Sequence, residues 1–284
     1  MRHHHRRARR EIGAVRRILL RRHRRRLGQL ELEGAAHGQL RARPAVANQK
    51  AVAGLPAAQF GAAAGDDQLI SLSDAELAAT REYTDKDIEG SPRIIGVDPA
   101  RFGDDRSVIV LRQGLRMEKP MIHHGVDNMQ LAGIVANLIE DRDPDAVFID
   151  SGAGAGVIDR LRQLDYYVME VPFGGKANYP NLFVNRRAEM WWAMKEWISN
   201  GGAIPNDTTL KQELLTPTYW YDAVGRRVLE GKDEIKKRLQ GGGSPDIADA
   251  LALTFAYPVA KQLPREVRER LDPTPRDHDP YEDM

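Results

Sequence analysis

Residues 94–112 read IIGVDPARFGDDRSVIVLR, and this segment determines how the following sequence is interpreted. Residues 94–97 predict a short buried strand that ends at Asp98, and the glycine- and aspartate-containing segment 99–105 predicts a turn. The run SVIVLR at 107–112 is rich in β-branched residues, which favour a second strand. Two strands joined by a short turn are antiparallel neighbours. The chain is therefore expected to enter its sheet through a hairpin whose first strand ends in a single acid.

Strands and helices then follow in a regular order. The expected elements are strands at 120–124, 146–149 and 168–171, helices at 129–141, 156–163 and 186–199, a hairpin at 219–229, a short helix at 233–239, and a last helix capped by Ser244 with Pro245 at its first position. This order predicts an α/β fold of the ribonuclease H-like type. Its mixed central sheet should have three antiparallel strands first and parallel strands later, with helices on its faces.

Four aspartates stand where such a fold would bring acids together. Asp98 and Asp150 each close a buried strand, whereas Asp246 and Asp249 share one face of the last helix among small alanines. Taken singly, each acid also fits a turn or a helix cap. Phosphodiester hydrolysis needs charge neutralisation and an activated water, which two Mg²⁺ or Mn²⁺ ions about 4 Å apart supply. Because such cations prefer carboxylate oxygens, the set predicts a two-metal site.

Four motifs in the same order carry a family resemblance. They are GVDPARFGDDRS at 96–107, FIDSGAG at 148–154, NRRAEMW at 185–191 and SPDIADAL at 244–251. Together they resemble the C-terminal nuclease domain of the phage terminase large subunit, over about residues 66–258. The resemblance implies a metal-dependent endonuclease that cuts concatemeric double-stranded DNA during genome packaging. It also implies Asp98, Asp150 and Asp249 as catalytic metal ligands, with Asp246 at an accessory position.

Basic residues near these acids are candidates for holding DNA, because cations beside a carboxylate site suit a polyanion crossing it. The candidates are Arg186, Arg187, Arg226, Arg227, Lys232, Lys236 and Lys237. A solvated face with local ion pairs, such as Glu234 with Arg238, is the alternative.

Composition divides the chain into four parts. Residues 1–65 form a leader, first Arg-rich and then rich in Ala and Gly, whose first 26 residues hold twelve Arg and one Glu. Such a density of like charge opposes compaction, so a disordered or non-native extension is expected, with a basic arm that grips nucleic acid as the alternative. Residues 66–90 are a connecting strand–helix segment, 91–260 the nuclease domain, and 261–284 a charged, proline-containing tail.

The absence of certain features excludes several classes of protein. The chain has no cysteine, which excludes disulfides and thiolate zinc sites and is compatible with a reducing cytoplasm. Its longest apolar run, 248–256, is far too short to span a bilayer. No G-x-x-x-x-G-K-[ST] loop occurs, so no ATPase activity is expected. The resemblance then implies a phage- or prophage-encoded protein in the bacterial host cytoplasm, with a separate packaging ATPase, a terminase small subunit and a portal protein as partners, and no membrane.

Two other functions fit the same sequence. One is a Holliday-junction resolvase of this fold. The other is a non-catalytic remnant that binds DNA or a packaging partner; the intact acids argue against it, and the missing motor argues for it. Plasmid nicking with and without Mn²⁺, and cleavage of a four-way junction, would separate these functions.

Overall fold

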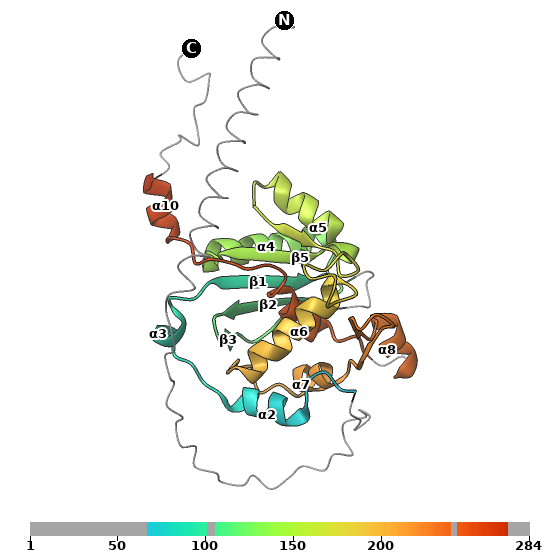
Figure 1. Cartoon of the computed structure of the whole chain (residues 1–284). Coiled ribbons are helices and arrows are strands. Elements are labelled where there is room, and N and C mark those ends of the chain that lie inside the picture. Colours follow the sequence, from blue (N-terminus) through green and yellow to red (C-terminus); the bar gives the residue numbers. More distant parts are fainter. Residues whose placement is uncertain (1–66, 101–105, 240–242, 272–284) are drawn as a thin grey trace, which may run out of the picture. The chain divides into compact units, whose positions relative to one another are not determined.

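The computed structural model describes residues 67–100, 106–239 and 243–271 (Figure 1). The expected leader and segment 101–105 of the first motif lie outside the described residues, as does 272–284 of the tail. The strands are β1 (Arg93–Asp98), β2 (Arg106–Gln113), β3 (Arg116–Met117), β4 (Met121–His124), β5 (Ala146–Asp150), β6 (Met169–Val171), β7 (Tyr219–Tyr221) and β8 (Arg227–Leu229). The helices are α2 (Leu72–Thr80), α3 (Asp85–Ile88), α4 (Asn128–Arg142), α5 (Ser151–Gln163), α6 (Arg186–Ser199), α7 (Thr208–Leu215), α8 (Lys232–Arg238), α9 (Asp246–Leu253) and α10 (Arg265–Leu271).

A mixed sheet forms the centre of the described part of the chain. Its strand order is β3-β2-β1-β5-β6, and β4 also pairs with β2. The strand β2 runs antiparallel to β1, β3 and β4, whereas β5 is parallel to β1 and β6 is parallel to β5. The predicted α/β fold is therefore confirmed, with its antiparallel strands first and its parallel strands later. The predicted hairpin is also present as β7 and β8.

Both faces of the sheet are covered, which explains why its central strands read as nearly continuous apolar runs. Side chains alternate along a strand. Odd-numbered residues such as Ile95 and Ile109 pack in one cluster with residues of α4 and α5, and even-numbered residues such as Ile94 and Val108 pack with residues of α6 and α9. Figure 1 shows α4 and α5 on one side of the strands and α6 and α7 on the other.

The helix α9 lies unusually close to β1. A Cβ atom added at Gly96 of β1 would lie 2.1 Å from the carbonyl oxygen of Ala250, so only glycine fits there. The C-terminal end of α9 is fixed by Arg112 of β2, whose Nε donates to Thr254 Oγ1 (2.8 Å) and whose Nη2 donates to the Thr254 carbonyl (2.9 Å). Burial lowers the pKa of Arg112 to about 10. The small residues of the last motif thus permit the close packing that the sequence predicts.

Replacing Gly96 with alanine is expected to lower the free energy of unfolding by at least about 3 kcal/mol, because the added methyl group must displace the backbone of α9. Gly133 of α4 provides a matched control, since a Cβ there would meet nothing within 4 Å. Gly133→Ala should instead stabilise the protein by about 0.5–1 kcal/mol through helix propensity. Urea unfolding of both variants checks the pair. Equal stability of Gly96→Ala and the wild type would contradict the close packing.

Two local expectations differ from the structure. Ser244 does not cap the last helix: α9 begins at Asp246, and the buried Ser244 Oγ has no hydrogen-bond partner within the described residues. The backbone N–H groups of Ile247 and Ala248 instead donate to Glu213 Oε2 of α7, so a distant acid replaces the local cap. In addition, the helix expected at 156–163 begins earlier, at Ser151. Among the helices that the structure describes, none combines the length and apolar composition of a bilayer crossing.

Candidate active site

The carboxyl ends of β1 and β5 bring two acids to one edge of the sheet. The strands are parallel neighbours with Val97 opposite Ile149, so Asp98 and Asp150 follow at the same level. Asp98 is almost completely buried, with 3% of its surface exposed. Asp150 also caps α5, where its Oδ1 accepts a hydrogen bond from Gly152 N (3.2 Å). This adjacency is the one that the sequence predicts from two strand-end acids.

Three carboxylates converge on the side chain of Lys232, the first residue of α8. The Lys232 Nζ atom lies 2.8 Å from Asp98 Oδ2, 3.1 Å from Asp249 Oδ2 and 3.7 Å from Asp246 Oδ1. These acids and Lys232, with Asp150, form what we call the acid cluster. All but Asp249 line one open cavity of about 400 Å³. The acid cluster therefore joins strand ends, the N-terminal turn of α9 and α8 in one place.

Asp249 is fully buried and rigidly held. Arg187 of α6 donates from Nε to Asp249 Oδ1 (2.8 Å) and from Nη2 to Oδ2 (3.4 Å), and Trp191 Nε1 also donates to Oδ1 (2.7 Å). The remaining Arg187 donor, Nη1, is occupied by the carbonyl of Glu230 (2.7 Å). A carboxylate with this many donors stays ionised in the interior, since charged acceptors make strong hydrogen bonds.

Four groups of the acid cluster have pKa values that differ from their ordinary values. The pKa of Asp98 is raised to about 7: burial is the largest cause, Lys232 lowers the pKa, and the carboxylates of Asp249 and Asp246 raise it. Burial also raises the pKa of Asp150. For Asp249, burial acts in the same direction, but Arg187 and Lys232 outweigh it and hold the pKa below its ordinary value. Burial would lower the pKa of Lys232, but the three acids raise it instead, so the amine stays charged. Asp249 is thus the permanent anion, and Asp98 is the acid that most needs a cation.

The cluster fits a divalent cation by the chemistry of its donors. Within the described ranges, no group of three or more His, Asp or Glu side chains is arranged as an assembled metal site. The ammonium of Lys232 lies between the acids. Asp98, Asp246 and Asp249 each turn one oxygen toward that single cation, and hard divalent cations prefer such oxygens.

The basic residues proposed to hold DNA are placed in three different ways. Arg186 and Arg187 are buried, and they pair with Glu189 and Asp249. Lys232 lies inside the acid cluster rather than on an outer DNA-facing surface. The others remain accessible to different degrees.

Lys236 and Lys237 are exposed on α8, and Lys236 lines the cavity. In the hairpin, Arg226 Nε donates to Asp222 Oδ2 (2.7 Å) while the Arg227 guanidinium lies 5.2 Å from the centre of the Phe183 ring. Of the candidates, Lys236 and Lys237 are thus the two that the structure leaves exposed on a helix beside the acid cluster.

Sequence reasoning missed Glu213, Arg106 and Trp191 as residues that build the site. Arg106 lies in the first motif and donates to Asp246, and Trp191 belongs to the third motif. Glu213 had a signal that the sequence could have revealed. It lies three residues after the buried Leu210, so the two side chains share one face of the helix. An acid on an apolar face is an informative exception.

Comparison with known proteins bears on the fold. No protein-family model matches the sequence, and no curated protein matches it. The nuclease domain of the large terminase subunit gp2 of bacterial virus Sf6, a mutant form solved with manganese and beta-thujaplicinol, superposes with a TM-score of 0.57 and 19% identity. The match covers 68% of this chain and 100% of that chain. The chain has the fold of a large-terminase nuclease domain.

The same terminase nuclease fold is found in a second phage. The large terminase nuclease of thermophilic phage G20c is 18% identical, with a TM-score of 0.50, and the match covers 67% of this chain and 98% of that one. An Sf6 domain solved with calcium has a TM-score of 0.54. The resemblance that the four motifs carry is therefore confirmed at the level of the fold.

Proposed function

We propose that this chain is a metal-dependent endonuclease that cuts double-stranded DNA, of the type that cleaves concatemers during phage genome packaging. The observation that carries the proposal is the convergence of Asp98, Asp246 and Asp249 on one cationic centre beside Asp150. The terminase nuclease fold supports it. Solved relatives of that fold contain manganese or calcium, which supports the choice of Mg²⁺ or Mn²⁺.

In this proposal, each residue of the acid cluster has a defined task. Asp98, Asp150 and Asp249 hold two divalent ions, with Asp246 as an accessory ligand; when bound, these ions activate water and neutralise the phosphate. Arg187 and Trp191 fix the orientation of Asp249. Lys232 keeps the crowded acids together in the absence of metal. Lys236 and Lys237 bind the phosphate backbone of the DNA that crosses the cavity.

Packaging would place this nuclease in a larger machine. Packaging would require ATPase activity in addition to this nuclease. A terminase small subunit and a portal protein are the further partners that packaging implies, and the bacterial host cytoplasm is the compartment.

The proposal can be tested with the purified full chain and either Mn²⁺ or Mg²⁺. The substrates are supercoiled plasmid, linear duplex and a synthetic four-way junction. We expect nicking and linearisation of the plasmid with either ion, no cleavage in EDTA, and no requirement for ATP. Preference for the four-way junction would instead favour a resolvase. A folded protein that cuts none of the three substrates with any divalent ion would refute nuclease function and favour a non-catalytic role.

A further inference from the structure

Glu213 of α7 makes an unusual connection to the start of α9. Its carboxylate is buried, with 6% of the residue exposed. Its Oε2 atom accepts hydrogen bonds from Ile247 N (2.7 Å) and Ala248 N (3.1 Å). These are N–H groups of the first helical turn, which have no partner within a helix. An acid 34 positions upstream thus fixes the turn of α9 that bears Asp246 and Asp249.

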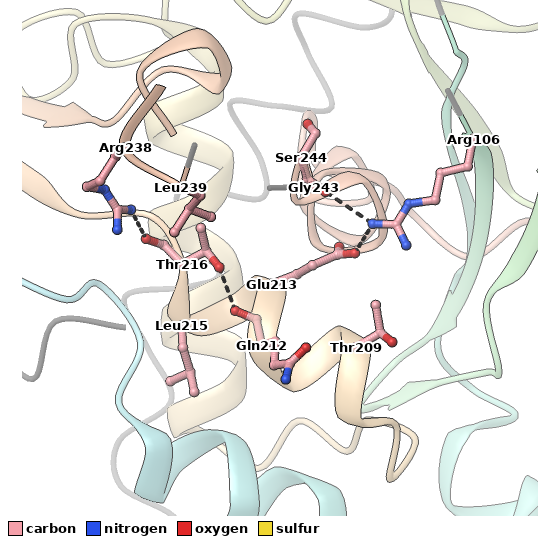
Figure 2. A pocket seen from close by; sticks show the side chains of 10 residues that line it. All are labelled: Arg106, Thr209, Gln212, Glu213, Leu215, Thr216, Arg238, Leu239, Gly243 and Ser244. Carbon is pink, nitrogen blue, oxygen red and sulfur yellow. Dashed lines mark hydrogen bonds and ion pairs between the residues drawn. The ribbon is translucent and has the colours of Figure 1, made fainter. Parts of the chain in front are cut away.

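The second oxygen of Glu213 connects to the acid cluster through Arg106. Glu213 Oε1 accepts from Arg106 Nη2, and Arg106 Nε donates to Asp246 Oδ2 (3.0 Å). Figure 2 shows Arg106 and Glu213 pointing toward each other, with Ser244 beside them. The Ser244 carbonyl also accepts from Arg106 Nη2 (3.1 Å). The other oxygen of Asp246, Oδ1, faces Lys232.

The geometry of the guanidinium explains why two acids share it. The Nε and Nη2 groups of an arginine match the two oxygens of one carboxylate, so an arginine beside a single acid tends to bind both of its oxygens. Here Nε serves Asp246 and Nη2 serves Glu213. Because Glu213 occupies Nη2, Asp246 receives only one hydrogen bond from Arg106, and its Oδ1 atom stays turned toward the acid cluster.

We propose that Glu213 is a positioning residue for the nuclease reaction: it fixes the first turn of α9 and, by dividing the Arg106 guanidinium, keeps Asp246 Oδ1 turned toward the metal site. This inference rests on the proposed nuclease function. Among the described contacts, Glu213 makes no direct hydrogen bond to Asp246 or Asp249, and it reaches them through Arg106 and the backbone of α9. Burying a carboxylate costs free energy, and Ser244, whose type commonly caps helices, lies just before α9 with an Oγ that has no hydrogen-bond partner within the described residues. The capping need alone therefore does not explain Glu213.

The test uses Glu213→Gln in the full chain. Glutamine has the same shape but one oxygen, so it can accept from α9 or from Arg106, not from both. The first readout is binding of Mn²⁺ alone, measured by electron paramagnetic resonance of the free ion. The second is plasmid cleavage, resolved into kcat and KM. We expect the Mn²⁺ affinity or kcat to fall about 10- to 100-fold, as for other residues that orient metal ligands, with KM for DNA unchanged.

Glu189→Gln is a closely matched control. Glu189 is also buried, pairs with an arginine (Arg186) and accepts two backbone N–H groups, from Asn178 and Tyr179. It does not contact the acid cluster through Arg106 or α9. Glu189→Gln should therefore lower the melting temperature, as Glu213→Gln does, while leaving Mn²⁺ affinity unchanged. If Glu213→Gln fails to fold, Arg106→Lys replaces it. A lysine has one nitrogen and lacks the fixed Nε and Nη2 donors that Arg106 divides between the two acids, so the same loss of Mn²⁺ affinity is expected.

Each result decides the question. Wild-type Mn²⁺ affinity and kcat in Glu213→Gln would overturn the inference while leaving the nuclease function intact. An equal loss of Mn²⁺ affinity in Glu213→Gln and Glu189→Gln would also overturn it, since Glu213 would then act only through stability. A wild-type protein that neither binds Mn²⁺ nor cuts DNA would refute the proposed function, and the inference with it.

Discussion

Asp98→Asn is expected to abolish metal-dependent DNA cleavage, lowering the rate at least about a thousand-fold, because a neutral amide cannot hold a hard divalent ion or stabilise its charge. Asp98 provides one of the three carboxylate oxygens that face Lys232, and it is the one acid of β1. Plasmid linearisation at saturating Mn²⁺, with the variant purified in parallel with the wild type, measures the effect. The parallel purification also controls for a contaminating nuclease.

Thermal unfolding distinguishes a loss of cleavage by Asp98→Asn from misfolding of the variant. The pKa of Asp98 in the folded protein is about 7, above its ordinary value of 3.8, so the folded state retains a proton that the unfolded state has released. Metal-free wild type should therefore lose stability as the pH rises from 4 to above 7, and Asp98→Asn should lack the part of this loss that Asp98 contributes. We expect the variant to melt at a higher temperature than the wild type at pH 8 in EDTA, and at a similar temperature at pH 4. Full cleavage by Asp98→Asn would refute its role as a ligand.

Arg187→Met is expected to destabilise the protein by about 3–5 kcal/mol, because it leaves the fully buried Asp249 without its main counter-ion. The double variant Arg187→Met with Asp249→Asn should recover most of this loss. Its amide oxygen can still accept from Trp191 Nε1, and no unpaired charge remains. Chemical denaturation of the wild type, Arg187→Met, Asp249→Asn and the double variant gives the coupling energy between the two positions.

An exposed ion pair serves as the control for Arg187. Arg226 pairs with Asp222 at 2.7 Å, but 38% of the arginine side chain is exposed. Arg226→Met should therefore change the free energy of unfolding by less than about 1 kcal/mol. Equal effects of Arg187→Met and Arg226→Met, or no recovery in the double variant, would contradict the assignment of Arg187 as the counter-ion of Asp249.

The sheet could be predicted from sequence because its strands carry their own signals. The apolar runs at β1, β2 and β5 are buried on both faces, and short turns or a crossover helix determine their direction. The adjacency of Asp98 and Asp150 follows from that topology alone. Neighbouring parallel strands end at the same edge of the sheet, so acids at their ends can be predicted to lie side by side without knowledge of helix packing.

The contacts across the site could not be predicted, because they depend on helix packing. Arg187 lies in the first turn of α6, and its positive charge suggested a contact with DNA. The packing of α6 against α9 instead points its side chain into the interior, where it pairs with Asp249. Lys232 contacts Asp98, which lies 134 positions earlier in the chain. Glu213 binds the first turn of α9, 34 positions later. The failed cap at Ser244 has the same cause, since a tertiary contact from α7 supplies the acceptor that a local rule assigns to serine.

The position of α9 late in the chain also has a consequence for biosynthesis. The helix packs against β1, β2 and α6, yet it leaves the ribosome after all of them. Until it emerges, the strand-end acids lack Asp246 and Asp249, and Arg187 lacks its carboxylate. Under the proposed function, a nascent chain thus has no assembled centre and cannot nick the DNA of the cell that makes it. Closure of the centre then becomes a late folding step, slowed by the long loops that it must join.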